Sequence, residues 1–255
     1  MKLRLDKLML DRGLATSRER AQAMILAGRV LVNGQKIEKP GSSIPHDADI
    51  RLLGAQMKYV GRGGLKLEAA LEHWKIDLSG RTCLDVGAST GGFTDCMLQH
   101  GAAQVIAVDT GYGQIAMRLR SDERVRLLEK TNARYLIAEQ LRSAGLTAGI
   151  NFIAIDVSFI SVTLVLPAVF QAAFVASGQP SRDLVVLIKP QFEVGRELVG
   201  KRGIVKDVQA QHKAVEKVRE SVAKLGGHSP EVIDSPILGM EGNREFLLHA
   251  EFPKD

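Results

Sequence analysis

The fold of this chain is decided by the stretch Asp85-Val86-Gly87-Ala88-Ser89-Thr90-Gly91-Gly92-Phe93-Thr94-Asp95. An apolar run at residues 83–86 leads into it, and a pattern typical of a helix follows from residue 93. We therefore predict a strand that enters a glycine-rich turn and leaves it as a helix. Glycines let backbone amides approach a ligand closely, and a helix N-terminus favours anionic or hydrogen-bond-accepting groups.

A second apolar run, residues 105–108, ends in Asp109, which is placed to accept hydrogen bonds from ribose hydroxyls. A dinucleotide fingerprint needs a glycine where this chain has Ser89, so a nicotinamide-dependent dehydrogenase is disfavoured. Asp85 suggests a cofactor with a charged amino group, such as the methionine part of S-adenosylmethionine. On this stretch alone, an ordinary strand–helix turn without a ligand stays an open alternative.

From residue 81 onward, strand patterns alternate with helical patterns. This alternation predicts an α/β fold, a Rossmann-like, doubly wound, mostly parallel sheet. We expect strands near 82–86, 104–109, 125–129, 151–156, 184–189, 229–234 and 245–251, and a long helix over 207–225. Because ligands bind at the carboxyl ends of such strands, the residues there are site candidates. They are Asp85, Asp109, Asn132, Asp156 and Lys189.

The first 60 residues carry the whole net charge of +5, with eleven lysines and arginines against six acidic residues. Helical patterns over 3–13 and 20–27 and a hairpin around Asn33-Gly34 predict a small α+β module. A compact basic segment suggests a polyanionic partner, with a solvated basic surface as the alternative.

The remaining features limit where the protein works. Residues 160–176 approach the length of a membrane span, but they contain Pro167 and Gln171, so we predict a buried helix and no stable membrane association. Cys83 and Cys96 are interpreted as buried hydrophobic residues, and no metal site is predicted. The N-terminus lacks a signal-peptide core, which predicts a cytoplasmic protein.

Residues 1–58 resemble the S4-like RNA-binding domain found in ribosomal proteins, pseudouridine synthases and some tRNA synthetases. The resemblance rests on R-L-D-K-L-M-L-D-R-G-L-A-T-S-R-x-R-A from residue 4 and G-R-V-x-V-N-G from residue 28. It implies structured RNA as the partner. The expected RNA contacts are Arg4, Lys7, Arg12, Arg18, Arg20 and Arg29.

The rest of the chain resembles the TlyA family of ribosomal RNA ribose methyltransferases, historically labelled haemolysins, which share the FtsJ-like fold. Besides the glycine-rich stretch, the matching pieces are R-G-G-L-K-L at 62–67, V-D-T-G-Y-G-Q at 108–114, T-N-A-R at 131–134, D-V-S-F-I-S at 156–161, I-K-P-Q-F-E-V-G at 188–195 and E-G-N-R-E-F at 241–246. The resemblance implies a class I methyltransferase domain at 65–255, joined to the first domain by a linker at 59–64. It also implies S-adenosylmethionine as cofactor and 2′-O-methylation of a cytidine in ribosomal RNA, presented as naked RNA or as a ribosomal subunit.

The resemblance also carries over site residues. The family's Lys-Asp-Lys-Glu catalytic set falls on Lys66, Asp156, Lys189 and Glu245. A lysine accepts the proton of a ribose hydroxyl only when it is uncharged, a state that nearby cations and desolvation favour. We expect Lys189 to be the base and Lys66 to position the hydroxyl. The implied cofactor contacts are Asp85, Gly87, Ser89, Gly91, Gly92, Phe93, Asp109 and Asn132.

Residues 190–206, with Arg196, Lys201 and Arg202, are predicted to form an RNA-contacting lid. Two other classes of function stay open at this point. One is a membrane-active haemolysin, and the other is a non-catalytic RNA-binding or ribosome assembly factor. The target nucleotide, the ribosomal subunit and the oligomeric state do not follow from the sequence.

Overall fold

The computed structural model divides into two compact units, residues 1–57 and 58–255. It describes residues 2–53, 58–146, 148–177, 182–239 and 241–252. Each unit has a hydrophobic core of its own.

The N-terminal unit packs two helices on short strands. Ser17 caps the second helix, since its hydroxyl accepts a hydrogen bond from the amide of Arg20 at 3.2 Å. Asn33 and Gly34 both have positive φ and turn the predicted hairpin, which is confirmed. The sequence did not predict the three remaining short strands. The elements are β1 (Lys2–Arg4), α1 (Leu5–Asp11), α2 (Arg18–Leu26), β2 (Val30–Val32), β3 (Gln35–Lys36), β4 (Ser43–Pro45) and β5 (Ile50–Leu52).

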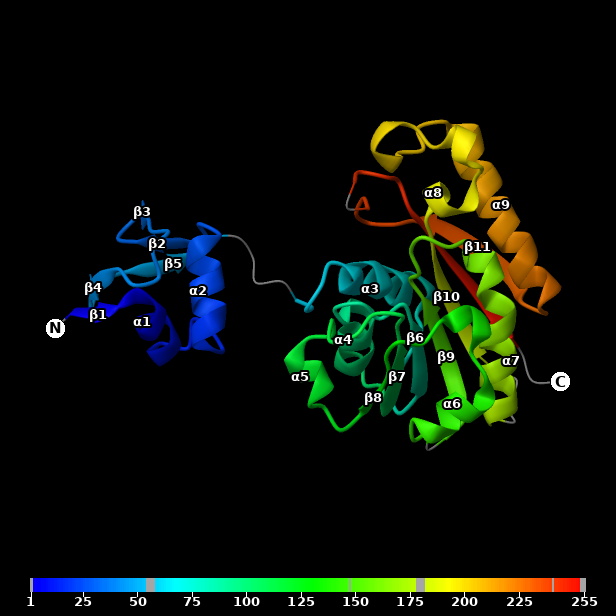
Figure 1. Ribbon diagram of the computed structural model, residues 1–255, viewed down its shortest axis with the longest axis horizontal. Helices are drawn as coiled ribbons and strands as arrows, with labels where there is room; N and C mark the ends of the chain where they lie inside the picture. The colour runs from blue at the N-terminus through cyan, green and yellow to red at the C-terminus, as the bar shows by residue number, and fades with distance from the viewer. Residues whose placement is uncertain (1, 54–57, 147, 178–181, 240, 253–255) are drawn as a thin grey trace. The chain divides into compact units, whose positions relative to one another are not determined.

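The second unit is built on one seven-stranded sheet with the order β11-β12-β10-β9-β6-β7-β8 (Figure 1). Neighbouring strands from β10 to β8 run parallel, whereas β12 runs antiparallel to both of its neighbours. The predicted fold class is confirmed, and each predicted strand is found within two residues of its expected bounds. The strands are β6 (Thr82–Val86), β7 (Gln104–Val108), β8 (Val125–Leu128), β9 (Ile150–Ile155), β10 (Arg182–Ile188), β11 (His228–Asp234) and β12 (Phe246–Phe252).

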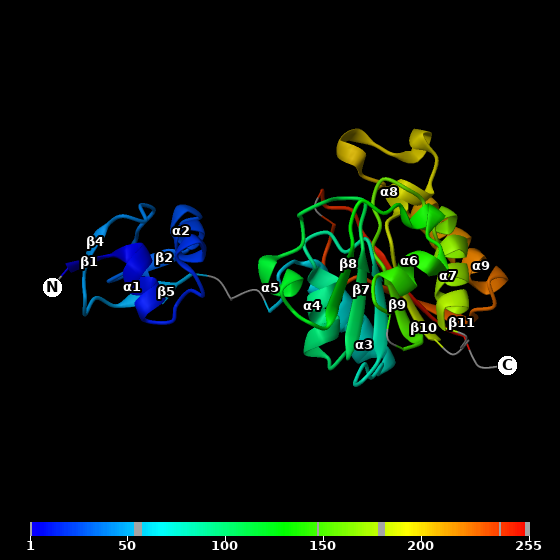
Figure 2. The same cartoon turned by 60° about the horizontal axis from the view of Figure 1, so that its bottom comes forward.

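Helices cover both faces of this sheet (Figures 1 and 2). Alternate residues of a strand serve different cores, because successive side chains point to opposite faces. Leu84 packs in the core under α6, α7 and α9, whereas Cys83 packs in the core under α3, α4 and α5. The helices are α3 (Gly63–Trp74), α4 (Gly92–Gln99), α5 (Met117–Arg120), α6 (Ala138–Ser143), α7 (Leu166–Ser177), α8 (Pro190–Glu193) and α9 (Val208–Lys224), with 3-10 turns η1 (Ala133–Tyr135), η2 (Val162–Leu164), η3 (Arg196–Leu198) and η4 (Lys201–Gly203).

The apolar stretch 160–176 forms η2 and most of α7, and its buried residues lie in the core beside β9. The buried helix predicted there is confirmed. Among the described residues, no helix combines the length and apolar character that a membrane crossing requires. Cys83 and Cys96 are both buried, as expected.

The structure differs from the sequence prediction at residues 59–64, which form part of the second unit. Tyr59 is buried, and its hydroxyl donates to Glu68 at 2.9 Å. The amide of Val60 donates to the carboxylate of Asp95 in α4 at 2.7 Å. Helix α3 begins at Gly63, two residues earlier than expected. The glycines in this segment permit close packing on α4, so they do not indicate a free linker.

Candidate active site

The glycine-rich turn joins β6 to α4 and packs against two other segments. Gly87 has φ +88°, and a Cβ there would lie 2.3 Å from the backbone oxygen of Asp156. At Gly92, a Cβ would lie 3.0 Å from the amide nitrogen of Gly64. Such distances exclude a larger residue without a backbone shift. The turn therefore needs glycine to bring the end of β9 and the start of α3 close to it.

A cavity of about 680 Å³ opens beside this turn, at the edge of the sheet where β9 and β10 end. Three groups of residues line it. They are the turn with Gly87, Ala88, Ser89, Thr90, Gly92 and Phe93; the segment Gly61, Arg62, Gly63 and Lys66; and the ends of the later strands with Asp156, Ser158, Phe159, Lys189, Gln191, Phe192, Arg202, Gly203, Leu238, Glu241, Asn243 and Glu245.

Two lysine–carboxylate pairs face this cavity. Lys66, on α3, forms a buried ion pair with Glu245, which directly precedes β12. Lys189 follows β10, and its Nζ lies 2.5 Å from Oδ1 of Asp156, which follows β9. Lys189 also donates to Oγ of Ser158 at 2.7 Å.

The direction of β12 explains how Glu245 reaches the site. Ile188 at the end of β10 pairs with Phe246 at the start of the antiparallel β12. The start of β12 therefore lies at the same sheet edge as the ends of β9 and β10. All four residues of the expected catalytic set line one cavity.

The expected cofactor residues separate into two groups. Gly87, Ser89, Gly92 and Phe93 line the cavity, whereas Asp109 and Asn132 lie outside its lining. Asp109 accepts hydrogen bonds from the amides of Ser89 at 2.8 Å and Gly111 at 2.6 Å, so it joins the turn to the loop after β7. Asn132 caps η1, and its Oδ1 accepts from the amide of Arg134 at 3.0 Å. Gly91, outside the lining as well, is the N-cap of α4, where a Cβ would collide with Leu119.

Asp85 is buried beneath the turn and does not line the cavity. Its Oδ2 accepts a hydrogen bond from the hydroxyl of Thr94 at 2.6 Å, while its Oδ1 has no partner. Burial raises the pKa of Asp85 to about 7, and the charges of Asp156 and Asp109 act in the same direction. An uncharged carboxyl beneath the turn is the state that this environment favours near neutral pH.

Two aromatic residues that the sequence analysis did not single out form part of the rim. Phe159 is 93% exposed and has φ +66°, a conformation that is costly for a large side chain. Its ring centroid lies 5.4 Å from that of Phe192, and both rings line the cavity. Strained, exposed aromatic residues at a cavity suggest binding. The phenylalanine of the D-V-S-F piece could have indicated a binding role as an aromatic residue near Asp156, but its left-handed backbone is visible only in the structure.

Residues 190–206 form α8, η3 and η4 and return to the cavity at Arg202 and Gly203. Arg196 and Lys201 are exposed. The buried Asn243 holds the end of the segment, since its Nδ2 donates to the oxygen of Gly203 at 2.8 Å and its Oδ1 accepts from the amide of Val205 at 3.0 Å. The loop is therefore tied to the segment that directly precedes Glu245 and β12.

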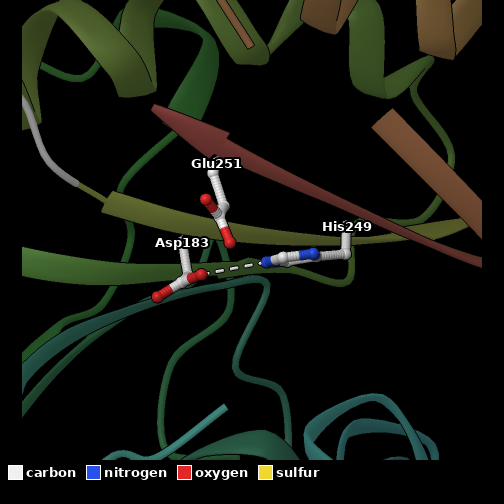
Figure 3. Close-up of side chains that lie close together, drawn as sticks. All are labelled: Asp183, His249 and Glu251. Atoms are coloured by element: carbon white, nitrogen blue, oxygen red, sulfur yellow. Dashed lines mark hydrogen bonds and ion pairs between the residues drawn. The ribbon is translucent and has the colours of Figure 1, made fainter. Parts of the chain in front are cut away.

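A second polar cluster lies at the opposite end of β10 from Lys189 (Figure 3). Asp183, His249 and Glu251 lie close enough to hold a metal ion. Nε2 of His249 lies 2.9 Å from Oδ1 of Asp183, and Arg81 binds the other oxygen of that carboxylate. Because Arg81 already supplies a positive charge, we interpret the cluster as an ion-pair network that joins β6, β10 and β12.

The basic residues of the N-terminal unit differ in their surroundings. Arg12 donates to the backbone oxygens of Ala48 and His46, and Arg29 donates to the oxygen of Leu53 at 3.1 Å. Both arginines therefore stabilise the unit itself. Lys7 and Arg20 are exposed, and Arg4 and Arg18 are bound by the buried Asp6.

Comparison with known proteins agrees with this geometry. Residues 59–252 match the model of the FtsJ-like methyltransferase family, and residues 3–50 match that of the S4 domain. The chain belongs to the FtsJ-like methyltransferase family. The family resemblance and the enzyme class predicted from the sequence are thereby confirmed.

Relatives of this FtsJ-like methyltransferase match along almost the whole chain. It is 46% identical over 99% of its length to "Putative rRNA methyltransferase YqxC" of Bacillus subtilis, of which it covers 86%. It is 42% identical over 96% of its length to the 16S/23S rRNA (cytidine-2′-O)-methyltransferase TlyA of Mycobacterium tuberculosis, of which it covers 88%. Among solved structures, "Putative hemolysin from Streptococcus thermophilus" is 41% identical with a TM-score of 0.72, and the match covers 98% of this chain and 88% of that one.

Proposed function

We propose that this FtsJ-like methyltransferase transfers a methyl group from S-adenosylmethionine to the 2′-hydroxyl of a cytidine in ribosomal RNA. The observation that carries the proposal is the meeting of two lysine–carboxylate pairs in one cavity beside the glycine-rich turn. The name of the tuberculosis relative supports cytidine and ribosomal RNA as the substrate. Ribosomal RNA as substrate implies that the protein acts in the cytoplasm.

The volume of the cavity suits a cofactor of the size of S-adenosylmethionine. About 680 Å³ lies within the range of small-molecule sites, roughly 300–1,000 Å³. Gly87, Ser89, Gly92 and Phe93 would hold the methionine end, where the close backbone packing leaves no room for larger residues. We propose that Asp109 contacts the ribose hydroxyls and that Asn132 lies near the adenine. Asp85 and Gly91 are proposed to support the cofactor indirectly, by holding the glycine-rich turn in place. When bound, S-adenosylmethionine supplies an electrophilic methyl group on a positively charged sulfur.

Lys189 is the proposed base for the ribose hydroxyl. It extends from the end of β10 and is held by Asp156 and Ser158. Lys189 would act as the base with its Nζ uncharged: that nitrogen takes the proton of the 2′-hydroxyl and afterwards releases it to solvent water. Lys66, held by the buried Glu245, is proposed to orient the hydroxyl oxygen.

The rim suits a nucleotide that has left its stack. A target ribose inside a folded RNA reaches a cavity of this kind only after its base is turned outward. The exposed ring of Phe159 offers a face for the displaced base, and base–aromatic stacking contributes about 1–3 kcal/mol per base. Arg202 and Arg62, which also line the cavity, are placed to pair with phosphates.

The N-terminal unit is proposed to capture structured RNA through phosphate contacts by Arg4, Lys7, Arg18 and Arg20. Arg12 and Arg29 contribute charge from positions fixed by backbone carbonyls. Binding of this kind weakens steeply as salt concentration rises, because counterions are released from the RNA. Assembled ribosomal subunits are the proposed substrate, since they present structured RNA.

The test is transfer of a radiolabelled methyl group from S-adenosylmethionine to purified ribosomal subunits. We expect label on RNA at one position, where the modified nucleotide resists alkaline cleavage. Lys189→Ala should abolish transfer, whereas Lys213→Ala, which removes an exposed lysine on α9, should leave it unchanged. Near-normal turnover of Lys189→Ala with bound cofactor would show that another group is the base.

Other outcomes of this test point to the alternative functions. Cofactor binding without label on any subunit would favour a non-catalytic assembly factor. Leakage of liposomes by the purified protein, without RNA or cofactor, would favour a haemolysin. The intact set of four charged residues in one cavity supports the enzyme over both alternatives.

A further inference from the structure

Asp6 is a wholly buried carboxylate in the first turn of α1. It accepts hydrogen bonds from Nε and Nη2 of Arg4 at 3.0 and 2.9 Å, and from Nε of Arg18 at 3.1 Å. Nε2 of Gln22 and the amide of Lys7 donate to it as well, both at 2.9 Å. One carboxylate thus joins the end of β1 to the start of α2.

The carboxylate stays ionised in this position. The hydrogen bonds from Arg4 hold the pKa of Asp6 well below its usual range, and those from Gln22 and Arg18 add to the effect against the opposing effect of burial. A buried charge needs such partners, because an unpaired one is strongly unfavourable.

The two arginines differ from Asp6 in being half exposed, with 52% and 50% of their side-chain surface accessible for Arg4 and Arg18. A guanidinium has five N–H donors, and Arg18 uses only its Nε on Asp6. Its terminal amino groups have no other partner among the residues that the structure describes. Arg4 uses one edge on Asp6 and keeps Nη1 beside Gly41. Each arginine therefore has donors left for an anion.

We infer that Asp6 is a positioning residue that holds Arg4 and Arg18 together as one phosphate-binding pair for RNA. This inference rests on the proposed function and names the group that organises its RNA contacts. Side chains fixed before binding do not lose their rotational freedom on binding, which strengthens the complex. Bidentate arginines suit phosphate geometry, and a buried anchor keeps two of them at a constant separation.

For Asp6→Asn, the added positive charge and the loss of the arginine anchor predict opposite changes in the affinity for RNA. This substitution keeps the side-chain shape and makes the unit more positive by one charge, so electrostatic attraction alone predicts tighter binding of RNA. Loss of the anchor predicts weaker binding. In the full-length protein, we expect the affinity for purified ribosomal subunits, measured by filter binding, to fall roughly tenfold, which corresponds to two side chains that must be ordered on binding.

A double-mutant comparison separates the anchor from general weakening. Arg18→Ala should reduce affinity in the wild-type background and much less in the Asp6→Asn background. Arg20→Ala is the matched control, because Arg20 is a neighbouring exposed arginine without a contact to Asp6. Its effect should be equal in both backgrounds.

Arg18→Lys provides a test that does not depend on the folding of Asp6→Asn. Lysine keeps the charge at a half-exposed position but lacks both the Nε–H that Asp6 binds and the terminal amino groups left for a phosphate. We expect Arg18→Lys to lose most of the affinity that Arg18→Ala loses. The control Arg51→Lys changes an exposed arginine of the same unit that pairs with Asp49, and it should bind as the wild type does. Circular dichroism of each variant checks that the N-terminal unit is folded.

The results distinguish the inference from the proposed function. Tighter binding by Asp6→Asn together with wild-type affinity of Arg18→Lys would overturn the role of Asp6 and leave RNA binding intact. Full affinity of Arg4→Ala and Arg18→Ala would overturn the inference alone. Absence of subunit binding by the wild type would overturn both the inference and the proposed substrate.

Discussion

Replacing Gly87 with alanine tests whether the turn and Asp156 approach as closely as the structure shows. The new Cβ would lie 2.3 Å from the oxygen of Asp156 and 2.8 Å from its carbonyl carbon, and the residue would keep φ +88°. The left-handed conformation costs alanine about 1–2 kcal/mol. Forcing an atom into a packed site costs a further 1–3 kcal/mol or so. We therefore expect Gly87→Ala to lower the free energy of unfolding by about 2–5 kcal/mol.

Gly113→Ala is the control that has the backbone strain of Gly87→Ala but not its steric clash. Gly113 has φ +71°, and a Cβ there meets no atom within 4 Å, so only the strain of about 1–2 kcal/mol applies. The assay is urea unfolding followed by the fluorescence of Trp74, the single tryptophan of the chain, which lies in the second unit. Methyl transfer should also fall about 100-fold in Gly87→Ala, because Asp156 is displaced. Equal destabilisation by the two variants would refute the close approach.

Three further predictions concern the site. Phe159→Ala should leave the urea midpoint unchanged, since the ring is exposed, but it should slow methyl transfer by about tenfold or more. Phe159→Trp should retain activity. Equal rates for the wild type and both variants would exclude stacking of a base on this ring. In the folded chain Asp85 keeps its proton up to about pH 7, whereas in the unfolded chain it loses the proton near pH 4. The free energy of unfolding of the second unit, measured in urea, should therefore fall by about 2 kcal/mol between pH 5.5 and 8, and Asp85→Asn should lose this pH dependence. If Asp85→Asn keeps the wild-type pH profile, Asp85 is not the titrating group. Glu245→Gln removes the carboxylate that pairs with the buried Lys66, and should lower the free energy of unfolding by about 3 kcal/mol. Glu245→Gln with Lys66→Met should restore most of this stability without activity, and no recovery would contradict a simple ion pair.

The central strands could be predicted because parallel strands, covered on both faces, are nearly continuous apolar runs. The shared edge where Asp156 and Lys189 lie followed from the alternation with helices, because the carboxyl ends of parallel strands meet at one edge of a sheet. The order of the strands did not follow from the sequence. The paired strands β1 and β4 could not be predicted, since each has only three residues and no periodic pattern. They form because backbone groups of a second segment lie beside them, which no local pattern reveals.

The sequence predicted where along the strands and loops the site residues lie, but not the direction in which their side chains point. Asp85 follows the expected strand pattern, yet its side chain turns inward to Thr94 and away from the cavity. Phe159 adopts a left-handed conformation that its neighbours impose, and the sequence contains no sign of this strain. Gly61, Gly63 and Gly64 predicted a linker, whereas the structure uses them for close packing, because flexibility and close packing require the same residue.

The pairing of Lys66 with Glu245 has a consequence for the time at which the enzyme becomes competent. These two residues are 179 positions apart. At 5–20 residues per second, synthesis of the intervening chain takes roughly 10 to 35 s, during which Lys66 has no partner carboxylate. Closing so long a loop also makes this contact slow to form. A nascent chain in which Glu245 and β12 have not yet been made therefore cannot form the Lys66–Glu245 pair, so this part of the cavity is incomplete until that segment has been synthesised and folded.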